Sequence, residues 1–367
     1  MPLPERLSDR LLLAHLAVLL CLCAVMAVSI SVPLRNALEF VSSNTVITIS
    51  LYALVSYALY ALCCLPLHYT QQRGSLLRDG LAPDAVAWLK SHARQEGFNA
   101  LWYMFALQII YLYLQSSSFW WIRVALFMVV LAALRQIAFG WVIPLLMKWP
   151  KVADRELVQR LSGLAKRLGI KVEDVYQSAL PNPDILNNGA FLVRLGKKAR
   201  VVISSAVAQF SPAEIEALLA RDLGQHHYHI HLKRALAQVL GVIALCAGVG
   251  LSFAPLARLL RFSPITDIAT VPLIVALVVV CGVPLRVLVN AFLSGFEQDA
   301  DHFALQLTRA PDALVSVLVR RSLGEDTSAA PRSWFMRLLR SAEPPLDQRL
   351  AVAQAFADEL LFTSRRG

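Results

Sequence analysis

The sequence predicts a mainly α-helical, polytopic membrane protein that carries a small α+β domain on its cytoplasmic side. Hydrophobic residues make up 57% of the 367 residues and charged residues only 16%, whereas soluble proteins are roughly 45–50% apolar and about 25% charged. Several apolar runs are long enough to cross a bilayer as helices. Three short β-type runs lie close together between residues 172 and 204, and they predict the small sheet.

Six apolar segments are predicted to span the membrane. The first has no small-residue cleavage site, so we expect a membrane anchor rather than a signal peptide. The six segments are Leu11–Val32, Val46–Leu67, Asn99–Leu114, Phe119–Met147, Ala235–Leu256 and Ile268–Leu293.

The basic residues predict the orientation in the membrane. Lys and Arg are concentrated in the hydrophilic segments 69–98, 148–234 and 298–367, and the positive-inside rule therefore places these segments and both termini in the cytoplasm. The same rule explains the net charge of +10. Nucleic acid is excluded as a partner because the basic residues are scattered and have no base-stacking aromatics beside them. We expect the lipid bilayer of a bacterial inner membrane as the environment.

The chain is predicted to have four parts. Residues 1–147 form a four-span bundle with a cytoplasmic hairpin at 69–98, residues 148–233 form a soluble core, and residues 234–295 hold two further spans. Residues 296–367 form a C-terminal helical region.

The soluble core is predicted to contain two helices and three strands. Apolar residues recur at helical spacing through Asp154–Leu168, and the β-type runs are Val172–Tyr176, Ala190–Arg194 and Arg200–Ser204. A second helix begins at Ser211, where a Ser-Pro-x-Glu sequence is typical of a capping box. We expect this helix to continue past Arg234 into the next apolar segment.

The second helix contains the most informative stretch, Arg221-Asp222-Leu223-Gly224-Gln225. Zinc peptidases place His-Glu-x-x-His on such a helix, because two His at i and i+4 bind one zinc while the Glu acts as general base. Arg221 has no lone pair to offer a metal, and Gln225 is a weak ligand. Asp222 keeps a carboxylate that is one methylene shorter than that of Glu.

Further motifs follow in a fixed order around the apolar segments. They are Pro144-Leu145-Leu146-Met147-Lys148, Asn187-Asn188-Gly189-Ala190-Phe191 with Arg200-Val201-Val202-Ile203, Glu297 and Asp301 before Phe303-Ala304, and Glu343-Pro344-Pro345-Leu346-Asp347-Gln348-Arg349-Leu350. In this order the motifs resemble those of the type I CAAX prenyl proteases and HtpX-like membrane zinc metalloproteases, which are gluzincins. The resemblance covers roughly residues 140–352.

The resemblance implies a role for each matched position. Arg221 and Gln225 stand at zinc-ligand positions, Glu297 at the third ligand position and Asp301 behind it. Asp222 stands at the general-base position. Glu343 replaces a transition-state-stabilising His, and Arg349 is retained. In the family the strand that corresponds to Ala190–Arg194 pairs with substrate backbone, which implies substrate-binding positions at Phe191 and at either Asn187 or Asn188.

These departures predict a gluzincin-like membrane protein that has lost zinc-dependent peptidase chemistry and binds or scaffolds peptide or membrane-protein clients. No cofactor is expected, and Arg221 is predicted to face Glu297, and also Glu343, in place of a metal. The alternative is an active metalloendopeptidase whose rebuilt zinc site uses the His226–His231 cluster and Glu297. A transporter that uses Arg135, Arg286 and Asn290 is the least favoured interpretation, because the sequence lacks repeat symmetry.

Overall fold

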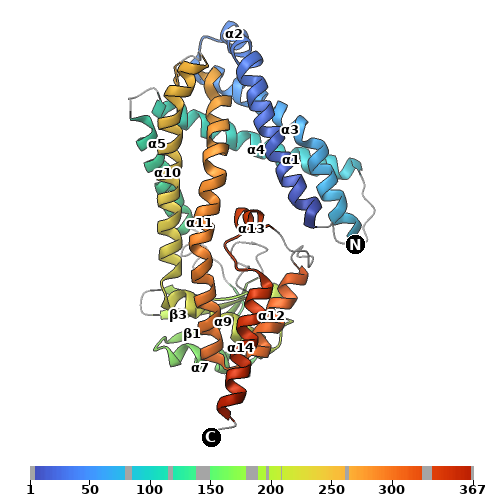
Figure 1. Cartoon of the computed structure of the whole chain (residues 1–367), viewed down its shortest axis with the longest axis vertical. Helices are drawn as coiled ribbons and strands as arrows, with labels where there is room; N and C mark the ends of the chain where they lie inside the picture. The colour runs from blue at the N-terminus through green and yellow to red at the C-terminus, as the bar shows by residue number, and fades with distance from the viewer. Residues whose placement is uncertain are drawn as a thin grey trace. The chain divides into compact units, whose positions relative to one another are not determined.

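The computed structural model describes residues 5–78, 85–114, 119–137, 149–178, 189–195, 198–207, 209–260, 264–324 and 333–364 (Figure 1). The chain divides into two compact units. Unit 1 comprises Met1–Val129, Val239–Val287 and Ser328–Leu339, and unit 2 comprises Val130–Gln238, Leu288–Thr327 and Arg340–Gly367.

Unit 1 is built from long apolar helices. α1 packs on α3, and α3 packs on α4, so these three helices form one group (Figure 1). The helices that contribute to unit 1 are α1 (Glu5–Val25), η1 (Met26–Ile30), α2 (Ser31–Val41), α3 (Thr45–Arg78), α4 (Ala85–Leu114), α5 (Trp120–Ile137), α10 (Ile230–Leu259), η4 (Ile268–Thr270), α11 (Val271–Thr308) and α13 (Trp334–Arg340). Of these, α5, α10, α11 and α13 also contribute residues to unit 2.

The protein is an integral, multi-pass membrane protein. Within the described residues, five helical segments are long and apolar enough to cross a bilayer: Asp9–Val41, Thr45–Thr70, Trp88–Leu114, Ile230–Leu259 and Ile268–Thr308. They contain the predicted first, second, third, fifth and sixth spans. The predicted fourth span, Phe119–Met147, corresponds to α5, whose described apolar part, Trp120–Leu134, is shorter. Residues 138–147 lie outside the described part of the chain, so a sixth span stays a prediction.

Unit 2 contains the predicted three-stranded sheet. β3 (Lys198–Ser204) lies in the middle, paired in parallel with β1 (Val172–Ser178) and in antiparallel with β2 (Ala190–Leu195). The order β1-β3-β2 makes β2 an edge strand in the described part of the sheet. β-Branched residues at the centre of β3 explain why this strand takes the buried middle position.

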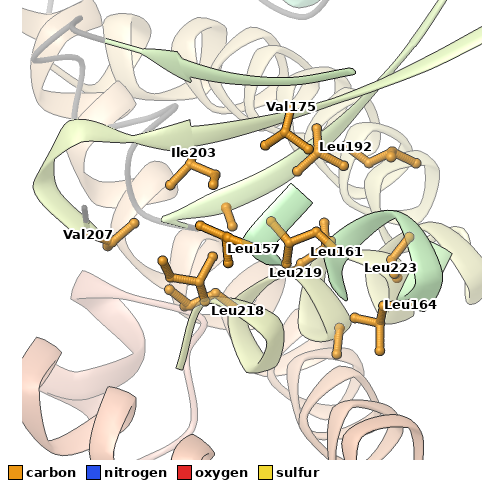
Figure 2. Close-up of a cluster of buried hydrophobic side chains, with 14 of the residues drawn as sticks. Leu157, Leu161, Leu164, Val175, Leu192, Ile203, Val207, Leu218, Leu219 and Leu223 are labelled. Atoms are coloured by element: carbon orange, nitrogen blue, oxygen red, sulfur yellow. The ribbon is translucent and has the colours of Figure 1, made fainter. Parts of the chain in front are cut away.

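Two helices cover the sheet and form the core of unit 2. α7 (Arg155–Arg167) begins at Asp154, whose side chain accepts hydrogen bonds from two backbone N–H groups, and it presents Leu157, Leu161 and Leu164 to the core. α9 (Pro212–His227) adds Leu218, Leu219 and Leu223. Figure 2 shows these side chains gathered with those of the strands, including Val175, Leu192 and Ile203. The apolar residues that recur at the predicted helical spacing therefore form the core of unit 2.

On its other side α9 packs against the C-terminal helices. Ala217 of α9 belongs to a second buried cluster with Leu305 of α11, Leu314 and Leu318 of α12 (Pro311–Gly324), and Ala353 of α14 (Leu346–Ser364). α9 is therefore covered on both sides, and the polar side chains of Arg221, Asp222 and Gln225 are buried.

The predicted continuous helix through Arg234 is wrong. α9 ends at His227, Tyr228 closes it by donating its backbone N–H to Gly224 O and His226 O, and His229 has a φ of 53°. This left-handed conformation interrupts the helical hydrogen bonds, and α10 begins anew at Ile230. The polar run from His226 to His229 offers no continuous apolar face that would favour a straight helix across this point.

Candidate functional site

The start of α9 is fixed locally by the predicted capping box. Ser211 Oγ accepts a hydrogen bond from the Glu214 backbone N–H at 3.4 Å, and Glu214 accepts one from the Ser211 backbone N–H at 2.7 Å. Pro212 occupies the first helical position. Arg221 and Gln225 then lie one helical turn apart on the same face of α9.

Gly224 allows α11 to approach this part of α9 closely. A Cβ atom at Gly224 would lie 3.0 Å from a ring carbon of Phe303 and 3.1 Å from its Cβ. A larger residue at this position would contact Phe303 and push the two helices apart. Because the residue is glycine, Glu297 and Asp301 of α11, themselves one turn apart, come within reach of α9.

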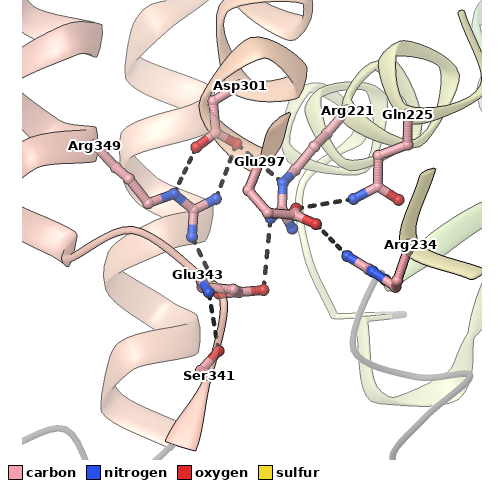
Figure 3. Close-up of polar contacts among 8 residues, drawn as sticks. All are labelled: Arg221, Gln225, Arg234, Glu297, Asp301, Ser341, Glu343 and Arg349. Carbon is pink, nitrogen blue, oxygen red and sulfur yellow. Dashed lines mark hydrogen bonds and ion pairs between the residues drawn. The ribbon is translucent and has the colours of Figure 1, made fainter. Parts of the chain in front are cut away.

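Arg221 lies among three carboxylates (Figure 3). Its Nη2 is 2.8 Å from Glu297 Oε2 and 3.5 Å from Glu343 Oε1, and its Nε is 3.0 Å from Asp301 Oδ1. The residue is only 3% exposed. A guanidinium with three carboxylate neighbours is held far more firmly than a surface ion pair.

Glu297 uses both carboxylate oxygens. Oε2 accepts hydrogen bonds from Arg221 and, at 3.1 Å, from Gln225 Nε2. Oε1 accepts from Nη2 of Arg234, which reaches Glu297 from the first turns of α10. The contact of Arg234 with Glu297 was not predicted from the sequence, because we expected one straight helix to continue past Arg234.

Asp301 and Glu343 are joined through Arg349. Arg349 Nε and Nη2 donate to the two oxygens of Asp301 at 2.6 and 2.9 Å, and Nη1 donates to Glu343 Oε2 at 3.3 Å. This is a bidentate pair of the strong kind. The Glu343 backbone N–H donates to Ser341 Oγ, which holds the loop before α14.

We call this group the arginine–carboxylate cluster. It consists of Arg221, Arg234, Arg349, Glu297, Asp301 and Glu343. Three guanidinium groups face three carboxylates, so the formal charges within the cluster cancel. Balanced charges and shared hydrogen bonds are what make a buried ionic group tolerable.

The pKa values in the cluster follow from these contacts. Burial by itself would raise the pKa of Glu343, but the positive charges of Arg221, Arg349 and Arg321 outweigh burial and lower that pKa to about 2. Burial likewise works against the charged form of Arg221, yet the carboxylates, Asp301 first, raise its pKa above the usual value. Both groups are therefore charged at neutral pH.

Asp222 points to a different partner. Its Oδ2 accepts a hydrogen bond from the Leu192 backbone N–H at 2.7 Å, and the neighbouring His226 Nε2 lies 3.2 Å from Leu192 O. Ser204 N–H donates to Gly189 O. Because antiparallel pairs alternate, the backbone groups of Leu192 point away from β3, toward the outer edge of β2. Asp222 and His226 therefore occupy the backbone groups with which an added strand would pair at this residue.

The structure thus brings together six of the residues that the motifs singled out: Arg221, Gln225, Glu297, Asp301, Glu343 and Arg349. Asp222 joins α9 to β2 instead. Phe191 lies in edge strand β2 and pairs with Val202 of β3, whereas Asn187 and Asn188 lie outside the described residues.

The residues of the cluster do not fit a catalytic zinc ion, which takes about three protein ligands with free lone pairs. Arg221 offers none, and its Nη2 lies 2.8 Å from the carboxylate of Glu297. Gln225 directs its amide nitrogen to the same carboxylate. Among the described residues of the cluster, only carboxylates are suitable ligands, and arginines hold each of them.

The histidines at the end of α9 and the start of α10 form a separate group. Ligand atoms of Asp222, His226 and His231 lie within 4.8 Å of one another, and Glu297 is not part of this group. The sequence suggested His227 and His231 as an i, i+4 pair. The break at His229 brings His226 to His231 instead, with ring centroids 4.8 Å apart.

Comparison with known proteins matches the chain to a family model and to solved structures. The model of peptidase family M48 matches residues 151–357, more than half of the chain. The crystal structure of S. mikatae Ste24p superposes with a TM-score of 0.60 at 15% sequence identity, covering 84% of this chain and 75% of that one. At this identity the likeness establishes the fold. No curated protein sequence matches the chain.

Proposed function

The chain belongs to peptidase family M48, and we propose that it is a non-catalytic member: a membrane pseudoprotease that binds or scaffolds peptide or membrane-protein clients. The predicted resemblance to the CAAX prenyl protease and HtpX-like family is confirmed by the family match and the fold. The position of the Arg221 guanidinium is the observation that carries the proposal.

Arg221 supplies the positive charge that keeps three carboxylates together without a metal. It cannot bind a water molecule as a Lewis acid and lower the pKa of that water, which is the step that catalytic zinc contributes to peptide hydrolysis. Asp222, at the general-base position, accepts a backbone N–H instead. Two functions of the peptidase site are thus replaced by structural contacts, which supports a role without hydrolysis.

We infer that clients bind at the outer edge of β2, near Phe191. Edge strands bind extended peptides by adding a strand. At Leu192 an incoming strand must displace Asp222 and His226, so client binding competes with a contact within the protein. In this proposal the protein lies in a bacterial inner membrane with both termini cytoplasmic, as the basic segments predict.

A crosslinking experiment tests client binding. A photoreactive residue replaces Phe191 in the full chain in its native membrane, and the same residue at exposed Glu173 of β1 is the matched control. We expect covalent adducts with polypeptides from position 191 and few from position 173. Equal labelling at both positions would contradict binding at β2.

A hydrolysis assay tests the loss of catalysis. The protein in detergent is incubated with Zn²⁺ and an unfolded membrane protein, and we expect no cleavage above a metal-free control. Zinc-dependent cleavage that is lost in Glu297→Gln would overturn the proposal.

The alternative active enzyme was predicted to use the His226–His231 cluster with Glu297, but Glu297 is not part of the group that His226 and His231 form with Asp222, so such an enzyme would have to use Asp222 instead. Two contacts disfavour it. Asp222 Oδ2 already accepts from Leu192 N–H, and since Leu192 O can only accept, His226 Nε2 is the donor in its contact with that carbonyl, which leaves only Asp222 Oδ1 and His226 Nδ1 for a metal. Zinc-dependent cleavage that is lost in His231→Gln, but not in Glu297→Gln, would establish this alternative.

A further inference from the structure

We propose that His68, His92 and Glu96 of unit 1 form a binding site for a divalent transition-metal ion, with zinc as the best fit. Nothing in the peptidase motifs involves these residues, and all three belong to unit 1, whereas the arginine–carboxylate cluster belongs to unit 2. The proposal therefore goes beyond the proposed function.

The fold places the three side chains at the same end of two apolar helices. His68 lies near the end of the apolar segment Thr45–Thr70 of α3, while His92 and Glu96 lie near the start of Trp88–Leu114 of α4. α3 and α4 follow each other in the chain and pack together (Figure 1). His92 and Glu96 are four residues apart and share one face of α4.

The ligand atoms converge on one point. His68 Nδ1 is 3.9 Å and His92 Nε2 is 3.8 Å from Glu96 Oε1, and all three atoms lie within 4.8 Å of one another. Zinc bonds of about 2.0–2.1 Å in a tetrahedral arrangement place ligand atoms about 3.4 Å apart. Small side-chain rotations would bring the three ligand atoms from their present separations to this distance. Two His and one carboxylate are a ligand set typical of zinc with a fourth, open position.

The imidazole nitrogens that face this point lack hydrogen-bond partners. Among the described residues, His68 Nδ1 and His92 Nε2 are buried nitrogen atoms with no hydrogen bond, and their distances to Glu96 are too long for one. The side chains are 24%, 11% and 16% exposed for His68, His92 and Glu96. Buried polar atoms in native proteins are normally satisfied, and an ion is one way to satisfy them.

Neighbouring side chains hold the ligands in position. Tyr57 OH donates to Glu96 Oε2 at 2.6 Å, which leaves Oε1 for a metal. The indole of Trp88 stacks on the His92 ring, with centroids 4.8 Å apart and an interplanar angle of 12°. The rings of His15 and His68 are 5.3 Å apart. Such outer contacts orient the ligands of known metal sites and raise their affinity.

The test uses the full chain in detergent, washed with a chelator and then titrated with Zn²⁺ against a fluorescent competing chelator. We expect saturation at about one zinc per chain, and affinity lowered roughly 100-fold or more in His92→Gln and in Glu96→Gln. Tyr57→Phe should lower the affinity about 10-fold. The matched control is His302→Gln, which changes an exposed histidine of α11.

A second readout separates binding from misfolding. Zn²⁺ should raise the Tm of the wild-type chain and of His302→Gln, but not that of His92→Gln or Glu96→Gln, whose metal-free Tm should stay near the wild-type value. Co²⁺ in place of Zn²⁺ should give a visible absorption band that is lost in the same two variants. Binding at about 1 mM or weaker, or tight binding that survives His92→Gln and is lost in His231→Gln, would overturn the proposal.

Discussion

Replacement of Arg221 by alanine should destabilise unit 2 strongly. The change removes one guanidinium from a buried cluster of three positive and three negative groups, which leaves a net charge of −1 in a site where Arg221 and Glu297 are 3% and 2% exposed. An unpaired buried charge is costly because it has lost its water without gaining a partner.

The expected loss of unfolding free energy in Arg221→Ala follows from the contacts that remain. Removing one partner of a buried ion pair costs about 3–5 kcal/mol. After the change, Glu297 keeps Gln225 and Arg234, and Asp301 keeps the bidentate bonds of Arg349. The loss should therefore lie at the lower end, about 3 kcal/mol, which lowers Tm by roughly 6–12 °C for a unit of this size.

The assay is thermal unfolding of detergent-purified variants, with Arg160→Ala as the matched control. Arg160 is 46% exposed and pairs with Glu156 on the surface of α7, so its removal should cost at most about 0.5 kcal/mol. The double variant Arg221→Ala/Glu297→Gln should be less destabilised than the sum of the single variants, because it restores neutrality. A Tm for Arg221→Ala equal to that of Arg160→Ala would refute this reasoning.

Three further predictions concern neighbouring positions. Asp222→Ala should lower the free energy of unfolding by about 1–3 kcal/mol, because the Leu192 N–H loses its acceptor. An unchanged Tm would contradict a stabilising hydrogen bond between Asp222 of α9 and Leu192 of β2. Glu343 has a lowered pKa, so its carboxylate stabilises the fold fully above pH about 4.5 and loses that effect as the pH falls toward about 2. The Tm difference between wild type and Glu343→Gln should shrink in this window, and because the side chain is 37% exposed, we expect only about 1 kcal/mol. Arg221→His/Asp222→Glu/Gln225→His should bind a zinc ion at this position, where the parent protein does not, and metal content measures the gain. If the triple variant gains no zinc, residues other than these three also prevent zinc binding at the site.

Local signals made much of unit 2 predictable. The apolar spacing of α7, the capping box of α9 and the three β-type runs each depend on neighbouring residues, and they predicted α7, the start of α9 and the three strands of the sheet. The contact of Arg221 with Glu297 was also predicted, because the motifs place both residues at one site.

The remaining contacts depend on geometry that the sequence does not display. The turn at His229 leaves no pattern beyond a polar run, and it decides where Arg234 and His231 lie. The bond between Asp222 and Leu192 depends on which backbone groups of β2 face outward, and this is set by register. The convergence of His68, His92 and Glu96 requires the packing of α3 on α4, which hydropathy alone does not specify.

Zinc content measured in a suitable variant tests most directly whether Arg221 has replaced the metal of the peptidase site. The variant His92→Gln/His231→Gln disables both histidine groups and leaves the arginine–carboxylate cluster intact. After purification and a brief chelator wash, we expect well below one zinc per chain by elemental analysis. About one tightly held zinc, lost when Glu297→Gln is added, would contradict this replacement.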